Sequence, residues 1–474
     1  MHADRFFSAD PTIRKLARNL YLSVKNQPIF APHGHVDPAL FSDPNARFGN
    51  PVDLFIRPDH YVIRTLYSNG IPLQKLGIST MAKQVEYNPR EVWELFCSQF
   101  HLFRATPSGV WLTTSLSDVF DIKQKLSKEN AGITYEILTE KLSTEEYSPR
   151  NLFDKFNIEL LATTDSAADF LPHHQKIQIS NWKRKIVPTF RLDSLVHLSN
   201  PGWIEEIKRL AANSNIEINN FNTFIQALES RRIAFQRLGA TATDFSAESA
   251  YTEELSPHQV DEIFQRALKG RVDQQDASQF VAHMLMEMAR MSAEDGMVMQ
   301  FHAGIIRNHN TALFQQFGPD IGGDIPLVVE FTRNFGPLLQ RFGNHPNFKL
   351  ILFTLDESTY TRELAPLAGH YPALRLGPPW WFNDSLNGIE RYLNQVMESA
   401  GIYKTVGFND DTRGFCSIPA RHDLWRRQVA NWLAGLLARY VIDEEDAHQM
   451  MYELCIGLAR NAYTMESNQN VKPE

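Results

Sequence analysis

The amino-acid sequence predicts an α/β fold, a TIM (β/α)8 barrel with a helical insertion after its first strand. Short apolar runs recur along the chain, and each ends in a polar, often ionisable residue. Helix-like stretches separate these runs, for example residues 257–268 and 278–290, in which apolar side chains return every three or four positions. Strand–helix alternation indicates parallel βαβ units, and eight of them suggest a closed barrel. The active site of such a barrel lies at the C-terminal ends of the strands.

The apolar runs give eight strands in chain order. The alternative is an open, doubly wound sheet, but no GxGxxG or GxxxxGK[ST] motif follows any run, which disfavours its nucleotide-binding form. The predicted strands are residues 27–32, 158–162, 185–190, 239–243, 297–301, 348–353, 374–377 and 405–408.

One gap interrupts the regular alternation and divides the chain. More than a hundred residues separate the first two predicted strands, and much of this gap has helical periodicity, as in residues 90–100. We therefore predict an N-terminal segment with the first strand at 1–36 and a helical insertion at 37–150. The rest of the barrel and the C-terminal helices take up 151–474.

Composition and charge restrict the class of protein. The apolar share of 43% and the charged share of 22% are those of an ordinary globular protein. The net charge is −8, and Lys and Arg never form a run longer than three, so neither a nucleic-acid nor a membrane partner is expected. Three widely spaced cysteines suit a reducing compartment, and no apolar stretch is long enough to span a membrane. We expect a cytoplasmic enzyme with a small-molecule substrate, in a homo-oligomer.

A metal site is suggested at the barrel seam. His33 and His35 are two residues apart at the end of the first strand, so their side chains share one face. Asp411 follows the eighth strand, which neighbours the first in a closed barrel, and these three ligands would suit Zn²⁺ or Mn²⁺. By itself an HxH pair is more often two surface or core histidines. Asp411 taken alone is more typical of a helix-capping turn.

Other ionisable residues also follow strand ends. Arg191 and Arg413 could hold a substrate carboxylate through paired hydrogen bonds, although an ion pair between Arg191 and Asp193 is an equal alternative. His302 ends the fifth strand, where it could be a third imidazole near the metal, a substrate contact or a hydrogen-bonded core histidine.

The order of these motifs resembles that of the uronate isomerase (glucuronate isomerase) family of the amidohydrolase superfamily, along nearly the whole chain. The resemblance implies a barrel of the metal-dependent hydrolase type. Two departures stand out: Asp244-Phe245 replaces the family's Asp-His, and Arg191-Leu192-Asp193 replaces its Arg-Pro-Asp. The matching motifs are His33-Gly34-His35, Asp59-His60-Tyr61, Thr163-Thr164-Asp165, Pro188-Thr189-Phe190-Arg191, His302-Ala303-Gly304, Arg307-Asn308-His309-Asn310, Trp380-Trp381-Phe382 and Asp411-Thr412-Arg413.

The resemblance implies reversible isomerisation of D-glucuronate to D-fructuronate and of D-galacturonate to D-tagaturonate, in hexuronate catabolism. It also implies one divalent metal, with zinc favoured and manganese possible. Two alternatives stay open: a metal-dependent amidohydrolase or lactonase on the same barrel, and a non-catalytic uronate-binding homologue. The expected roles are catalytic for His60, Tyr61, Asp244 and Arg413, substrate-binding for Arg191, His302, Arg307 and Trp381, and metal-binding for His33, His35 and Asp411.

Overall fold

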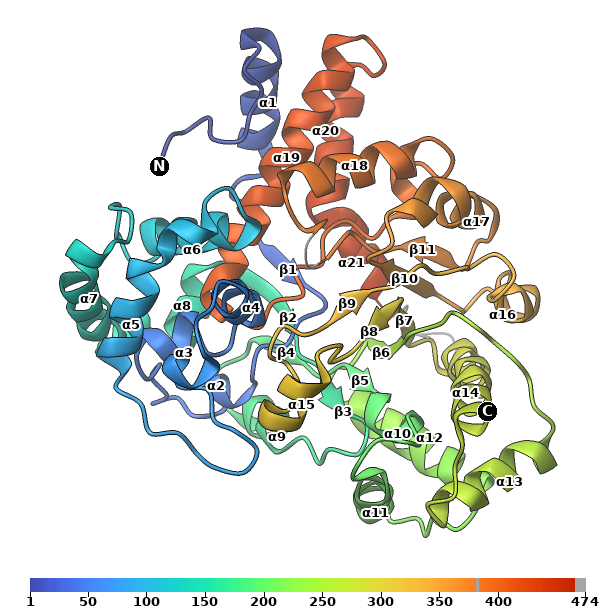
Figure 1. Ribbon diagram of the computed structural model, residues 1–474. Coiled ribbons are helices and arrows are strands. Elements are labelled where there is room, and N and C mark those ends of the chain that lie inside the picture. The colour runs from blue at the N-terminus through green and yellow to red at the C-terminus, as the bar shows by residue number, and fades with distance from the viewer. Residues whose placement is uncertain (381–382, 465–474) are drawn as a thin grey trace.

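Parallel strands form the centre of the computed structural model, which describes residues 1–380 and 383–464 (Figure 1). Two strand paths are interrupted, because β3 (Asp165–Ser166) continues β2 and β5 (Phe190–Arg191) continues β4. The order around the ring is β1-β2-β4 and then β3-β5-β6-β7-β10-β11, with every pair parallel. The other barrel strands are β1 (Ile29–Ala31), β2 (Ile158–Ala162), β4 (Lys185–Val187), β6 (Ala242–Ala247), β7 (Val298–Ala303), β10 (Leu350–Thr354) and β11 (Leu374–Leu376).

The eighth segment closes the ring but is less regular than predicted. Residues 405–412 join their neighbours through two isolated bridges, from Thr405 to Leu376 and from Thr412 to Gly34. The N–H of His35 donates to the carbonyl of Thr412 at 2.8 Å. Gly407 has φ +66° and Asp411 has φ +45°, and these left-handed conformations interrupt an extended ladder. The predicted barrel is therefore confirmed, with a broken eighth strand.

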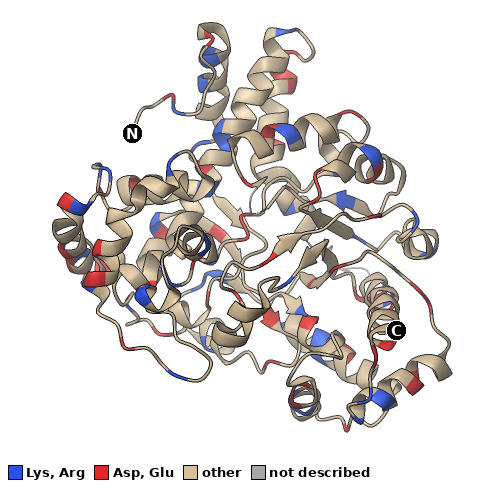
Figure 2. Ribbon diagram, viewed as in Figure 1, with Lys and Arg blue, Asp and Glu red and all other residues tan. Residues whose placement is uncertain are grey.

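Helices cover the outside of the ring, with acidic and basic segments interspersed along them (Figure 2). None of the helices within the described residues is long and apolar enough to cross a membrane. A short antiparallel pair, β8 (Ile305–Ile306) and β9 (Ile325–Pro326), follows β7. The outer helices are α9 (Pro172–Ile179), α10 (Asp193–Val196), α11 (Trp203–Ser214), α12 (Phe221–Arg237), α13 (Pro257–Leu268), α14 (Gln274–Asp295), α15 (Thr311–Phe317), α16 (Gly336–Phe342), α17 (Ala365–His370) and α18 (Leu386–Met397).

The segment between β1 and β2 is helical and packs on the barrel. Its buried aromatic residues, including Trp93 and Phe120, share one hydrophobic cluster with Ile29, Ile158 and Ile186 of the first three barrel strands. The insertion is thus anchored on one side of the ring, where its helix α4 reaches the barrel mouth. Its helices are α2 (Ala39–Ser42), α3 (Pro51–Phe55), α4 (His60–Ser68), α5 (Pro89–Ser98), α6 (Pro107–Asp118), α7 (Ala131–Ser143) and α8 (Pro149–Lys155).

The two ends of the chain contribute a separate set of helices. Helix α1 (Pro11–Val24) packs along α19 (Ile418–Ala438) and α20 (Glu444–Tyr452), and all three project together in Figure 1. A π-helical turn (Glu453–Gly457) and α21 (Leu458–Tyr463) then bring the chain back to the barrel. Ile456, Ala459 and Tyr463 join Phe30, Leu160, Val187, Ala242, Val298, Ile351 and Val406 in one buried cluster, so α21 fills the interior at the end opposite the mouth.

Candidate active site

A polar cavity of about 710 Å³ opens at the C-terminal ends of the barrel strands. Its volume is in the range of small-molecule sites. Two of the predicted residues, Tyr61 and Asp244, are not part of its lining, and Trp381 lies outside the described residues. The predicted residues that line it are His33, His35, His60, Arg191, His302, Arg307, Asp411 and Arg413.

His33, His35 and Asp411 converge as the sequence suggested. The Nε2 atoms of His33 and His35 lie 3.4 and 3.1 Å from Oδ1 of Asp411. That oxygen is buried and lacks a hydrogen bond of good geometry within the described residues, as does Nδ1 of His33. The three ligand atoms lie within 4.8 Å of one another, close enough to share one ion. Asp411 lies in a left-handed turn, and no helix begins at Asp411 or Thr412.

Burial and charge tune these three groups differently. Burial lowers the pKa of His35 to about 4, although Asp411 opposes the shift, so this imidazole is neutral near pH 7. For His33 the effect of burial is outweighed by the carboxylates of Asp244 and Asp411, which raise its pKa. Burial would raise the pKa of Asp411, but the close imidazoles of His33 and His35 outweigh this and lower it well below its usual range. A carboxylate beside a neutral imidazole is a set of ligands that divalent metals use.

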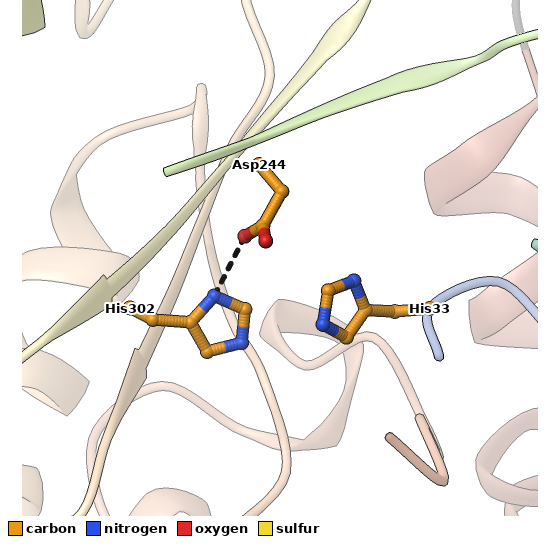
Figure 3. Close-up of side chains that lie close together, drawn as sticks. All are labelled: His33, Asp244 and His302. Atoms are coloured by element: carbon orange, nitrogen blue, oxygen red, sulfur yellow. Dashed lines mark hydrogen bonds and ion pairs between the residues drawn. The ribbon is translucent and has the colours of Figure 1, made fainter. Parts of the chain in front are cut away.

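A second group shares His33 and includes Asp244 and His302 (Figure 3). Nδ1 of His302 lies 2.8 Å from Oδ1 of Asp244, and the ring of His302 stacks on that of His33 with centroids 4.9 Å apart. The carboxylate of Asp244 is fully buried, but Arg191 and His302 outweigh the effect of burial and lower its pKa. Because a carboxylate can only accept a hydrogen bond, Nδ1 of His302 carries the proton. Nε2 is then the acceptor nitrogen of this imidazole.

Each predicted arginine is paired with a carboxylate. All three donor nitrogens of Arg191 are engaged: Nε and Nη2 donate to Asp193 at 3.0 Å, and Nη1 donates to Asp244 at 2.9 Å. Arg413 donates to Asp320 at 2.8 Å, and its side chain is 31% exposed. The ion pair between Arg191 and Asp193, which the sequence left as an equal alternative, is therefore present.

Arg307 and Asp324 form a further pair, at 2.6 Å, on the loop that follows β7. The side chain of Arg307 is 41% exposed, so its guanidinium can exchange partners more readily than Arg191, which bonds to two carboxylates and is 23% exposed. The guanidinium groups of Arg307 and Arg413 thus line the cavity, and each can exchange its carboxylate partner for another carboxylate.

His60 and Tyr61 begin α4, because Asp59 caps this helix by accepting from the N–H of Tyr61 at 2.9 Å. His60 lines the cavity, and Tyr61 lies against it with ring centroids 4.5 Å apart. Tyr61 also contacts Trp111 edge-on at 5.6 Å. Burial lowers the pKa of His60 to about 3 and raises that of Tyr61 well above its usual value, so both groups are neutral at pH 7.

Sequence reasoning missed several residues of the cavity wall. His197 lies after α10, with Nε2 3.0 Å from the carbonyl of Ser246, and Ser246 donates to Asp193. Asp320 and Asp324, the partners of the two arginines, come from the long loop after β7. The only signal that could have found them is their position after a strand end, which many non-functional residues share.

Comparison with known proteins identifies the family. The glucuronate isomerase family model matches residues 4–463. A uronate isomerase of Nostoc punctiforme is 52% identical over 98% of both chains. The crystal structure of a glucuronate isomerase from Caulobacter crescentus superimposes with a TM-score of 0.96 at 44% identity, over 99% of this chain and 98% of that one. A uronate isomerase from Thermotoga maritima has the same fold, with a TM-score of 0.91 at 24% identity, over 98% of this chain and 99% of that one. The chain belongs to the glucuronate isomerase family.

Proposed function

We propose that this protein interconverts D-glucuronate and D-fructuronate, and D-galacturonate and D-tagaturonate. The observation that carries the proposal is one cavity that combines a convergent set of His and Asp ligands with two partly exposed arginines. A hexuronate needs both, because it carries a carboxylate at C6 and reacting oxygens at C1 and C2.

One divalent metal fits the ligands that this chain offers. The buried Oδ1 of Asp411 and the two nearby imidazole nitrogens lack hydrogen bonds of good geometry to one another, which is expected of atoms that share a cation. Two imidazoles and a carboxylate suit zinc, and also manganese. Such an ion would be held by His33, His35 and Asp411. Its positive charge would stabilise the negative charge that develops on the substrate oxygens.

The C6 carboxylate of the substrate would meet Arg413 and Arg307. Each has a partly exposed guanidinium that pairs with a carboxylate of the cavity wall, so a substrate carboxylate can exchange with Asp320 or Asp324. Arg191 is already bonded to two carboxylates, and its proposed part is to hold Asp193 and Asp244 in place. Asp244 in turn orients His302 through Nδ1, which leaves Nε2 of His302 directed to a ligand.

The proton transfers involve the neutral His60 and Tyr61. In the isomerisation a proton leaves C2 and returns at C1, while the hydroxyl proton of O2 is lost and O1 gains one. His60 lines the cavity, so it is the member of the pair that would meet the substrate. Tyr61 stacks on His60 and stays protonated, so its hydroxyl keeps the proton that it would donate in the transfer.

An NMR time course on the purified protein with D-glucuronate and D-galacturonate tests the proposal. We expect both aldoses to yield the corresponding ketose, with exchange of the C2 hydrogen for solvent deuterium where the proton is released. A hydrolysis product without ketouronate would favour the hydrolase alternative. Binding without any product, with Zn²⁺ or Mn²⁺ added, would point to a non-catalytic homologue.

A further inference from the structure

The C-terminal helix α21 carries a buried polar group into an otherwise apolar barrel interior. Tyr463 is 2% exposed and packs in the cluster formed by Ile351, Val406 and Ile456. Buried hydroxyl groups are costly unless they are hydrogen-bonded, and phenylalanine would fill the same space without that requirement. The hydroxyl of Tyr463 therefore calls for an explanation.

That hydroxyl joins two parts of the barrel. It accepts from Nδ2 of Asn409 at 2.6 Å and donates to Oε1 of Gln300 at 2.7 Å. Nε2 of Gln300 donates in turn to the carbonyl of Thr243, at 3.3 Å. Asn409 is 2% exposed and Gln300 fully buried, so this chain of bonds is shielded from bulk solvent.

The two partners of Tyr463 hold equivalent places in the sequence. Gln300 lies two residues before His302 on β7, and Asn409 lies two residues before Asp411. β7 and the eighth segment are not neighbours in the ring, because β10 and β11 lie between them. The backbone ladder therefore links the two segments through two intervening strands, whereas the hydroxyl of Tyr463 bridges their side chains directly.

We propose that Tyr463 is a positioning residue that holds the segments carrying Asp411 and His302 at a fixed separation. The inference rests on the proposed metal-binding function of the site. Asp411 has a left-handed backbone conformation, which a non-glycine residue keeps only where its surroundings hold it. The Asn409–Tyr463 bond fixes the residue at the entrance of that turn. The C-terminal helix thus serves the site from the closed end of the barrel.

The test uses the full-length protein loaded with Co²⁺, whose visible absorption reports the geometry of its ligands, together with Zn²⁺ affinity from chelator competition. In Tyr463→Phe we expect a changed cobalt spectrum and about tenfold weaker zinc binding, the lower end of the range for groups that orient metal ligands. Tyr392→Phe is the matched control. Tyr392 is equally buried, at 1% exposure, and donates to the carbonyl of Leu376 at 3.2 Å on the outer side of β11. Its spectrum and affinity should match those of the wild type.

A second variant covers the case in which Tyr463→Phe does not fold. Gln300→Met removes the other end of the bridge at similar volume, and it should shift the cobalt spectrum in the same way. An unchanged spectrum and an unchanged zinc affinity in whichever variant folds would overturn the positioning role. Failure of the wild-type protein itself to bind either ion would instead overturn the proposed metal site, and the inference with it.

Discussion

The two ends of the barrel are built from opposite chemistry. At the mouth, ionisable side chains gather in two groups that share His33, one with Asp244 and His302 and the other with the partly buried His35 and Asp411. At the closed end, aliphatic strand residues and α21 form an apolar cluster whose polar bridge through Tyr463 is fully hydrogen-bonded at the hydroxyl. Buried charges are retained at a cost in stability, whereas apolar packing stabilises. Substitutions at the mouth should therefore alter chemistry more than stability, and those at the closed end the reverse.

The largest effect is expected for Asp411→Asn. The substitution removes the only carboxylate from the proposed ligand set, so Zn²⁺ affinity and turnover should each fall about 100-fold or more, beyond the range for residues that merely orient ligands. Chelator competition and the NMR assay measure the two quantities. The melting temperature of the metal-free protein should fall less than for the closed-end variant described below. If Asp411→Asn kept the full metal affinity, the result would indicate that the cation binds instead at the group that contains Asp244 and His302.

A somewhat smaller loss is expected for Tyr61→Phe. Removing the hydroxyl of Tyr61 should lower kcat about 100-fold, at the low end of the range for proton-transfer groups, while KM changes little. The ring and its contacts with His60 and Trp111 persist, so folding should be preserved. Steady-state kinetics and far-UV circular dichroism measure both. Substantial activity without the hydroxyl of Tyr61 would mean that His60 alone of the two residues transfers the proton.

The mouth and the closed end also differ in how far the sequence revealed them. The approach of His33 and His35 to Asp411 could be predicted because strand periodicity places both histidines on one face, and ring closure brings Asp411 beside them. Asp320 and Asp324 could not be predicted as arginine partners, since loop conformation, not periodicity, positions them.

The position of Tyr61 behind His60, off the cavity wall, likewise depends on how α4 packs against the barrel. The polar bridge at Tyr463 was equally hidden, because nothing in the sequence of α21 shows that it enters the barrel. Strand ends could be read from the sequence, whereas the contacts of an insertion, a loop or a terminal helix could not.

At the closed end, Ile351→Ala should destabilise the protein without touching the chemistry. Ile351 is fully buried beside the C-terminal helix, and its truncation leaves a cavity, with an expected loss of about 3 kcal/mol in the free energy of unfolding. Chemical denaturation measures the loss, and kcat should stay within about twofold of the wild type. A large fall in kcat with little loss of stability would contradict the division between the two ends.

The smallest effect concerns Asp165, a mouth carboxylate outside the proposed metal set. Burial raises its pKa to about 7. The hydroxyl of Thr163, which donates to Asp165 at 2.6 Å, opposes this shift but does not cancel it. In the folded protein the carboxyl thus stays protonated up to about pH 7, whereas in the unfolded chain it ionises near pH 4. The folded state binds the extra proton between these values, so its stability falls as pH rises from about 4 to 7 and levels off above.

Asp165→Asn should remove that dependence. The amide oxygen can still accept from Thr163, but it does not ionise. Between pH 5 and pH 8 the wild type should lose about 2.6 kcal/mol more of its unfolding free energy than the variant does, at about 1.4 kcal/mol per pKa unit. Urea denaturation at both pH values measures the difference. If the unfolding free energy of the two proteins changed equally with pH, the pKa of Asp165 would be the same in the folded and unfolded states. Burial at this part of the mouth would then not destabilise the ionised carboxylate.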